Sequence, residues 1–118
     1  MSIDAGKGER REVRAQSVGD VVAEAVKPVE EGGKILIEKS SNEMVMMFVN
    51  YHYQMWRMTS DIARMFSENQ PIADTYKSLG LHAVDVAFIR KLIDDKQAFA
   101  LAERYGMGNG FKYTPKKK

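Results

Sequence analysis

The sequence predicts an all-α protein built around one long amphipathic helix. Apolar side chains recur with helical spacing over residues 41–67, and two or three shorter segments share that spacing. The one strand candidate has no second strand in the sequence with which to pair. The length of 118 residues suits a single domain, and the absence of cysteine excludes a disulfide framework and cysteine-based metal sites.

The long helix is predicted to begin at a capping box, with Ser40 as the N-cap and Glu43 three residues later. A heptad stripe follows, with apolar residues at alternating spacings of four and three: Met44, Phe48, Tyr51, Met55, Met58, Ile62 and Met65. An adjacent stripe lies one position later: Val45, Val49, His52, Trp56, Thr59, Ala63 and Phe66. Two stripes make a face wider than a coiled-coil contact needs, so we expect the heptad stripe to be an interface between copies, in a homodimer or larger assembly. In the alternative, later helices cover the whole face of a monomer.

The segment before the long helix is predicted to be less regular. Residues 1–16 are rich in charge and poor in apolar groups, which is typical of a flexible arm. In residues 17–40 we expect a short helix from Ser17 to Val26, which Pro28 stops because proline lacks a backbone donor. An extended segment should follow, with the strand candidate at residues 35–37.

The segment after the long helix is predicted to contain shorter helices. Pro71 suits the first turn of a helix that Gly80 ends as a left-handed cap. A further helix should run from about Ala83 to Tyr105, with either a kink or a new N-cap at residues 94–95. The helical core thus spans residues 41–105, and residues 106–118 form a basic tail too rich in glycine and lysine to pack.

Positive charge is concentrated in the last eight residues. Residues 111–118 contain four basic residues and no acidic one, whereas residues 1–110 contain 14 basic and 16 acidic residues. Lysines can neutralise phosphates while neighbouring aromatic rings stack on bases. We therefore expect nucleic acid, with DNA favoured, to contact both tails through Arg10, Arg11, Arg14, Phe111, Lys112, Tyr113, Lys116, Lys117 and Lys118. In the alternative, the tail only keeps the protein in solution.

The sequence lacks the patterns of catalytic and cofactor sites. The glycines from Gly106 to Gly110 do not have the spacing of a dinucleotide fingerprint, and His52 and His82 belong to no metal-binding spacing. We expect His52 to be a hydrogen-bonded core or interface residue, and His82 to cap a helix or face solvent. The sequence thus predicts no enzyme activity, no metal, no cofactor and no small-molecule substrate.

Membrane and secretion signals are also missing. The longest apolar run, residues 44–49, is far shorter than the roughly 20 residues that span a bilayer. The N-terminal sequence has no apolar core of the kind found in secretory signals. We therefore expect a soluble, intracellular protein, or one held within a nucleoprotein particle, with no membrane partner.

These observations favour a non-enzymatic protein that self-associates through its long helix and binds nucleic acid non-specifically, in an architectural, nucleoprotein, or virion coat and packaging role. One alternative is a helix-turn-helix DNA-binding regulator, because Tyr76 to Val86 has the order of helix, glycine turn and valine. Against it, the second helix lacks side chains that read base edges. Another alternative is a protein–protein adaptor, without nucleic-acid binding, whose methionine-rich helix packs against a partner.

Overall fold

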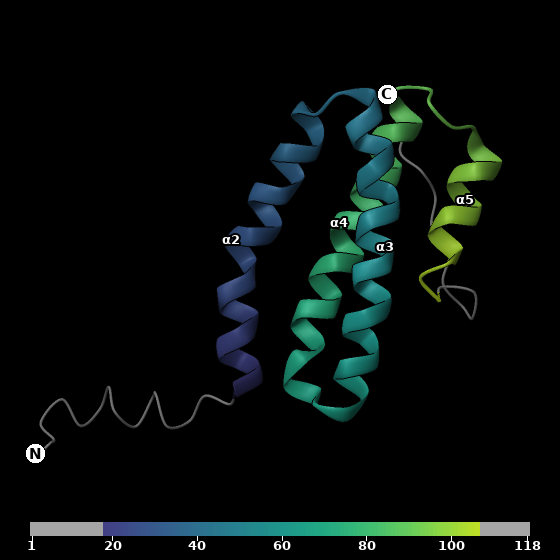
Figure 1. Cartoon of the computed structure of the whole chain (residues 1–118). Helices are drawn as coiled ribbons and strands as arrows, with labels where there is room; N and C mark the ends of the chain where they lie inside the picture. The colour runs from purple at the N-terminus through teal and green to yellow at the C-terminus, as the bar shows by residue number, and fades with distance from the viewer. Residues whose placement is uncertain (1–17, 107–118) are drawn as a thin grey trace, which may run out of the picture.

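The computed structural model describes residues 18–106, which contain four α-helices and one short 3-10 helix (Figure 1). In chain order these elements are α2 (Val18–Lys39), α3 (Asn42–Met65), η1 (Ser67–Asn69), α4 (Gln70–Ile89) and α5 (Asp95–Glu103). The all-α prediction is confirmed. However, α2 and α4, with 22 and 20 residues, are nearly as long as α3 with 24.

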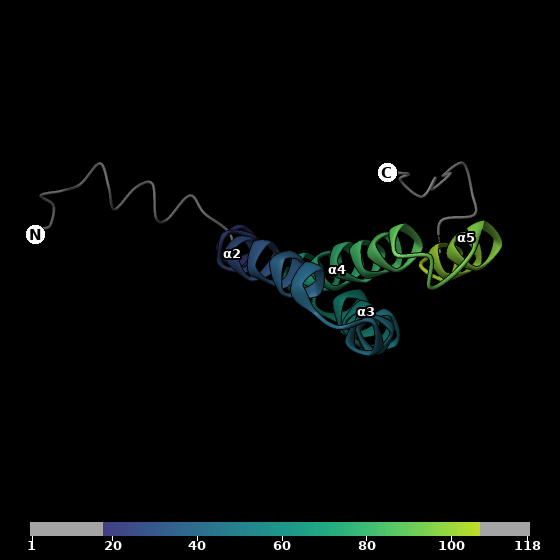
Figure 2. The ribbon, with the colours of Figure 1, turned by 90° about the horizontal axis from the view of Figure 1, so that it is seen from above.

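α4 is the central helix of the molecule. α2 and α3 each pack along α4 and make little contact with one another. Seen from above, they lie against two different sides of α4 (Figure 2), and α3 runs antiparallel to both α2 and α4 (Figure 1). The core lies where these helices meet, and its largest fully buried side chains are Ile37, Val45, Val49 and Val84.

α3 forms over nearly the whole predicted range, although its N-cap differs from the expected one. The Ser41 side chain accepts a hydrogen bond from the Met44 amide at 3.2 Å, whereas the Ser40 hydroxyl donates to the Leu36 carbonyl at 2.6 Å. Ser40 therefore belongs to the end of α2. The predicted N-cap is thus wrong by one residue, and the predicted capping box of Ser40 and Glu43 does not form.

α2 is one continuous helix, so the predicted stop at Pro28 and the predicted extended segment are both wrong. Pro28 is exposed on the side of α2 that faces away from α4, where the carbonyl left unpaired can bind water. Gly33 faces α4, and a β-carbon there would lie 2.8 Å from a Leu79 methyl group. The local sequence of this segment suggests a break, but close packing against α4 keeps it helical.

α4 is also continuous, so the predicted left-handed cap at Gly80 is wrong. Gly80 lies against Tyr105, and a β-carbon at this position would overlap the Tyr105 hydroxyl. The glycine therefore permits a close contact within a helix. The helix-turn-helix interpretation loses the turn on which it depends.

The ends of α4 and α5 follow local signals more closely. Pro71 lies in the first turn of α4, as predicted. α4 ends at Ile89, and Lys91 adopts a left-handed conformation with φ of 64°. Of the two alternatives at residues 94–95, the new N-cap is confirmed, because Asp94 and Gln97 form a reciprocal capping box at 2.8 and 2.9 Å.

Arg90, at the end of α4, forms hydrogen bonds with the connection between α2 and α3. Its guanidinium donates to the carbonyls of Glu38 and Ser40, both at 2.7 Å, and to the Asn42 side chain at 3.1 Å. These carbonyls lie at the C-terminal end of α2, where a helix leaves acceptors without intrahelical donors. One side chain therefore links the end of α2, the start of α3 and the end of α4.

Candidate interaction surfaces

The two apolar stripes of α3 have different environments. In the adjacent stripe, Val45, Val49, His52 and Ala63 are buried, and Trp56 and Thr59 are half-buried. The heptad stripe stays largely open: Tyr51 is 52% exposed, Met58 57% and Met65 76%, with Met44 and Ile62 also exposed and Phe48 and Met55 half-buried. Within the described residues, α4 thus covers only part of the apolar face, so the alternative in which later helices cover all of it is wrong.

α2 carries a matching exposed stripe. Its members are all more than half exposed: Val18, Val21, Val29 and Leu36. Each of them comes one position before a residue that faces α4. In the same way, each residue of the heptad stripe of α3 comes one position before a residue of the adjacent stripe, which faces α4. Because α2 and α3 run antiparallel, this offset turns both stripes to the same side of the molecule and toward each other.

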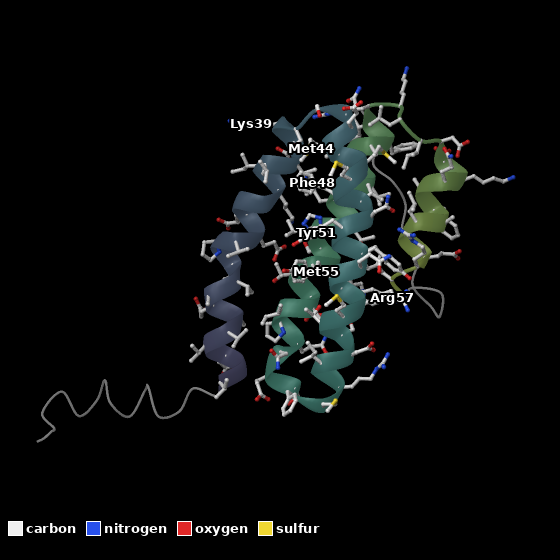
Figure 3. All side chains as sticks on the ribbon, viewed as in Figure 1. Lys39, Met44, Phe48, Tyr51, Met55 and Arg57 are labelled. Atoms are coloured by element: carbon white, nitrogen blue, oxygen red, sulfur yellow. The ribbon has the colours of Figure 1, made fainter. Side chains whose placement is uncertain are left out.

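The two stripes form one surface in the angle between α2 and α3. Figure 3 shows Met44, Phe48, Tyr51 and Met55 on the side of α3 that faces α2. We call this the α2/α3 apolar surface, and its exposed members are Val18, Val21, Val29, Leu36, Met44, Tyr51, Met58, Ile62 and Met65.

The two histidines are both used within the fold. His52 is buried among the rings of Phe48, Tyr51 and Tyr76, and its Nδ1 lies 2.9 Å from the Phe48 carbonyl. Burial lowers the pKa of His52, and the hydrogen bond to Phe48 opposes this shift only in part. The predicted hydrogen-bonded core histidine is confirmed. His82 lies in the interior of α4, 2.8 Å from the Glu38 carboxylate of α2, so the prediction that it caps a helix is wrong.

A second candidate surface lies where α3 meets the end of α5. Tyr53, Trp56 and Tyr105 pack ring against ring at centroid distances of 4.9 to 5.9 Å. Beside them is a hollow of about 290 Å³, lined by Tyr53, Trp56, Arg57, Ser60, Asp61, Arg64 and Arg104. We call it the arginine–aromatic hollow.

Sequence reasoning missed this hollow. Arg57 and Arg64 are two helical turns apart on α3, so helical periodicity alone places them on the same side of that helix. The approach of Arg104 from α5 is a tertiary contact, for which the sequence contains no local signal.

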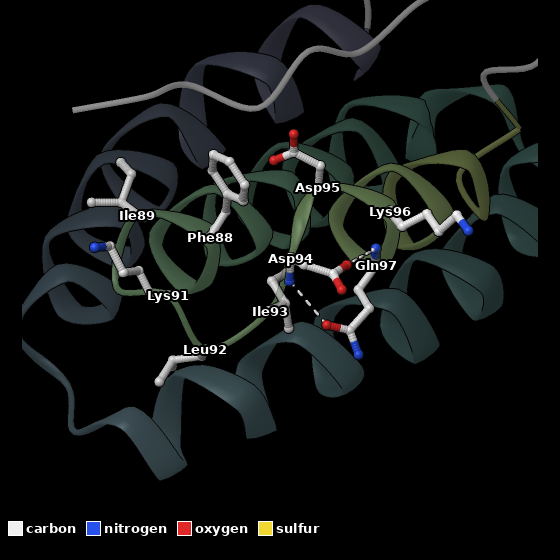
Figure 4. Close-up of a pocket in the computed structure, with 9 residues that line it drawn as sticks. All are labelled: Phe88, Ile89, Lys91, Leu92, Ile93, Asp94, Asp95, Lys96 and Gln97. Atoms are coloured by element: carbon white, nitrogen blue, oxygen red, sulfur yellow. Dashed lines mark hydrogen bonds between the residues drawn. The ribbon is translucent and has the colours of Figure 1, made fainter.

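Another hollow lies at the connection between α4 and α5 (Figure 4). Its volume is about 920 Å³, and its lining comprises residues 88, 89 and 91–97. Asp94 and Gln97, two of its polar groups, are already engaged in the capping box that starts α5. These two polar groups therefore serve to begin α5.

The nucleic-acid-binding residues predicted in the two tails lie outside the described residues. Within residues 18–106, no three His, Asp or Glu side chains gather in a way that could hold a metal ion. None of the described helices has the length and apolar character needed to cross a membrane. Comparison with known proteins finds no matching family model, no similar curated protein and no similar solved structure.

Proposed function

We propose that this chain is a non-enzymatic helical assembly protein, in which a second copy covers the α2/α3 apolar surface and the tails bind nucleic acid. The exposure of the heptad stripe carries the proposal, since most of the stripe beside it is buried or half-buried within the chain. Large apolar patches on a soluble domain commonly mark interaction sites.

The area of the α2/α3 apolar surface suits a dimer. The exposed fractions of its nine members are equivalent to about five fully exposed apolar side chains, or about 500 Å² of apolar area. A standard interface buries about 800 Å² on each partner, of which somewhat more than half is apolar. The surface therefore supplies the apolar part of one standard interface.

A second copy is the occupant that fits best. The stripe on α3 extends from Met44 to Met65, so its cover must be a long apolar helix. The flanking sequences are poor in large apolar groups: residues 1–17 contain Met1, Ile3 and Val13, and residues 107–118 contain Met107, Phe111 and Tyr113. A second copy offers an α3 of equal length with the same stripe, which is the self-complementarity that a twofold interface requires.

Substitution of one exposed methionine tests the interface. Met58→Glu places charge in the centre of the stripe at a position that is already 57% exposed, so the monomer should still fold. Light scattering on size-exclusion fractions should give a multiple of 13.4 kDa for the wild type and 13.4 kDa for this variant. Phe99→Glu on α5 is the matched control, because this exposed side chain lies away from the surface, and it should keep the wild-type mass. A wild-type mass of 13.4 kDa at every concentration contradicts self-association.

Nucleic-acid binding is proposed from the charge of the tails, with Lys112, Lys116, Lys117 and Lys118 neutralising phosphates. For duplex DNA each phosphate contact contributes about 0.9 to the slope of log affinity against log salt. Deletion of residues 111–118 should therefore lower that slope by about 3–4 in an anisotropy titration with a random 30-base-pair duplex, and leave the oligomer mass unchanged. Replacement of Lys27, Lys39, Lys77 and Lys96 by Gln removes the same charge from the body and should change the slope less. Equal slopes for the deletion and the wild type contradict the role of the tail.

A further inference from the structure

We infer that the arginine–aromatic hollow is a phosphate-binding site through which the helical body, and not only the tails, contacts the nucleic-acid backbone. The inference deepens the proposed nucleic-acid binding and rests on it. It assigns a role to Arg57 and Arg104, which the sequence leaves as ordinary surface residues.

The charge of the hollow favours an anion. Three arginines and one aspartate line it, a net charge of +2. Arg64 lies 2.8 Å from the Asp61 carboxylate, so this acid is neutralised inside the cluster. Within the described residues, no carboxylate lies within ion-pair distance of Arg57 or Arg104. Two guanidinium groups therefore remain for a ligand.

The Tyr53 ring lies beside both guanidinium groups and stacks on that of Arg104. The Arg104 carbon lies 4.0 Å from the centroid of the Tyr53 ring, and the Arg57 carbon lies 5.9 Å from the same centroid. Tyr53 in turn packs edge-on against Tyr105, which is buried. Stacking uses the flat face of a guanidinium and leaves the N–H groups at its edge, which match two phosphate oxygens. A site that is ordered in advance loses less entropy when it binds.

The size and position of the hollow suit a polymer backbone. A volume of about 290 Å³ accommodates a phosphate with part of a sugar, and lies at the small end of sites that enclose whole ligands. Arg57 lies on the α5 side of α3, whereas Met44 and Tyr51 lie on its α2 side (Figure 3). Self-association through the α2/α3 apolar surface would thus leave the hollow open to a ligand.

Trp56 makes the site directly measurable. It is the chain's single tryptophan and it lines the hollow, so a ligand there should change its fluorescence. We would titrate the full chain with a fluorescently labelled thymidine 20-mer, and follow Trp56 emission and the anisotropy of the label in the same samples. Both signals should saturate at the same oligonucleotide concentration.

Paired substitutions identify the contacts. Arg57→Gln with Arg104→Gln should weaken binding several-fold and lower the salt slope by about 1.4, which is two single-strand phosphate contacts. The control, Lys27→Gln with Lys39→Gln, removes the same charge from α2 and should lower the slope less. Arg57→Lys with Arg104→Lys keeps the positive charge but loses bidentate hydrogen bonding to phosphate, and should bind with intermediate affinity. Circular dichroism melting confirms that each variant is folded.

The outcomes separate this site from tail binding. Equal slopes for the two Gln variants, or an anisotropy change with constant Trp56 emission, overturn the site while the tails can still bind. A Trp56 response to inorganic phosphate without oligonucleotide binding overturns the nucleic-acid assignment and leaves free phosphate as the ligand. Constant Trp56 emission with both probes overturns the site altogether. The proposed tail binding fails separately, if deletion of residues 111–118 leaves the slope unchanged.

Discussion

The contact between Gly80 and Tyr105 predicts a stability change opposite in sign to helix propensity. In the interior of an ordinary helix, replacing glycine with alanine stabilises by roughly 0.5–1 kcal/mol. At Gly80 the new β-carbon would overlap the Tyr105 hydroxyl and lie 2.7 Å from its ring carbon Cζ. Tyr105 is only 2% exposed and packs against Trp56 and Tyr53, so its ring has no room to shift.

The magnitude follows from the loss of the Tyr105 ring from the core. Truncation of a large buried aromatic side chain costs about 3–5 kcal/mol, and displacement of Tyr105 should cost a similar amount. After the gain in helix propensity, Gly80→Ala should lower the free energy of unfolding by about 2–4 kcal/mol. Tyr105→Phe should be neutral or slightly stabilising, because within the described residues the buried hydroxyl has no hydrogen-bond partner. Burial accordingly raises the pKa of the Tyr105 phenol.

Urea unfolding followed by circular dichroism and by Trp56 fluorescence measures both effects. The double variant, Gly80→Ala with Tyr105→Phe, should be less destabilised than Gly80→Ala alone, because removal of the hydroxyl relieves part of the overlap. A Gly80→Ala protein at least as stable as the wild type would refute the close contact. Gly80 would then be an ordinary glycine in a helix.

Three further predictions concern single residues. Lys91→Gly should raise the melting temperature, with a gain of about 1 kcal/mol, because Lys91 holds a φ of 64° that glycine adopts without strain. Arg90→Met should lower the free energy of unfolding by about 2–3 kcal/mol in urea titration, because it removes the donors to Glu38, Ser40 and Asn42. The lowered pKa of His52 favours its neutral form in the folded state, so stability should be complete above about pH 6.5 and decrease as the pH falls toward the folded-state pKa. The loss should approach 1.4 kcal/mol per pH unit, and His52→Gln should remove this dependence when unfolding is measured from pH 7 to pH 5.

The fold class and α3 could be predicted because their signals are local and repeated. Seven consecutive heptad positions carry apolar groups, so an error at one position does not change the assignment. The N-cap was less secure, since Ser40 and Ser41 can both cap a helix. A hydrogen bond from Ser40 back to Leu36 decides between them, and that bond exists only once α2 is helical.

The predicted breaks failed where tertiary packing outweighs the local preferences of glycine and proline. Gly80 was interpreted as a helix end and Gly33 was assigned to an extended segment, yet each lies inside a helix where a neighbouring side chain approaches closely. The approaching residues, Leu79 and Tyr105, are distant in the sequence, so no local pattern distinguishes these glycines from helix ends. Pro28 lies on the exposed side of α2, where burial of the opposite side outweighs one missing hydrogen bond.

The sequence predicted two apolar stripes on α3 without showing which one faces the chain's own core. The residues themselves contain a physical signal. The buried stripe includes the small side chains Val45, Val49 and Ala63, which allow α4 to approach closely. The exposed stripe includes Met44, Met58 and Met65, which are long and flexible and adapt to a partner. Small side chains where α4 approaches closely, and flexible methionines in the exposed stripe, therefore favour this assignment of the core stripe and the proposed interface.

The two proposed surfaces lie on different sides of α3, and this arrangement links assembly to binding. A dimer formed through the α2/α3 apolar surface would carry two arginine–aromatic hollows and two pairs of tails on one particle. Binding of one site to a polymer raises the effective concentration of the second, so two weak contacts become strong on a ligand long enough to reach both. Met58→Glu, which removes no basic residue, should therefore weaken binding to a long duplex far more than binding to a short one. Comparison of the two lengths in the same variant cancels the effect of the added charge, because that charge repels both ligands alike.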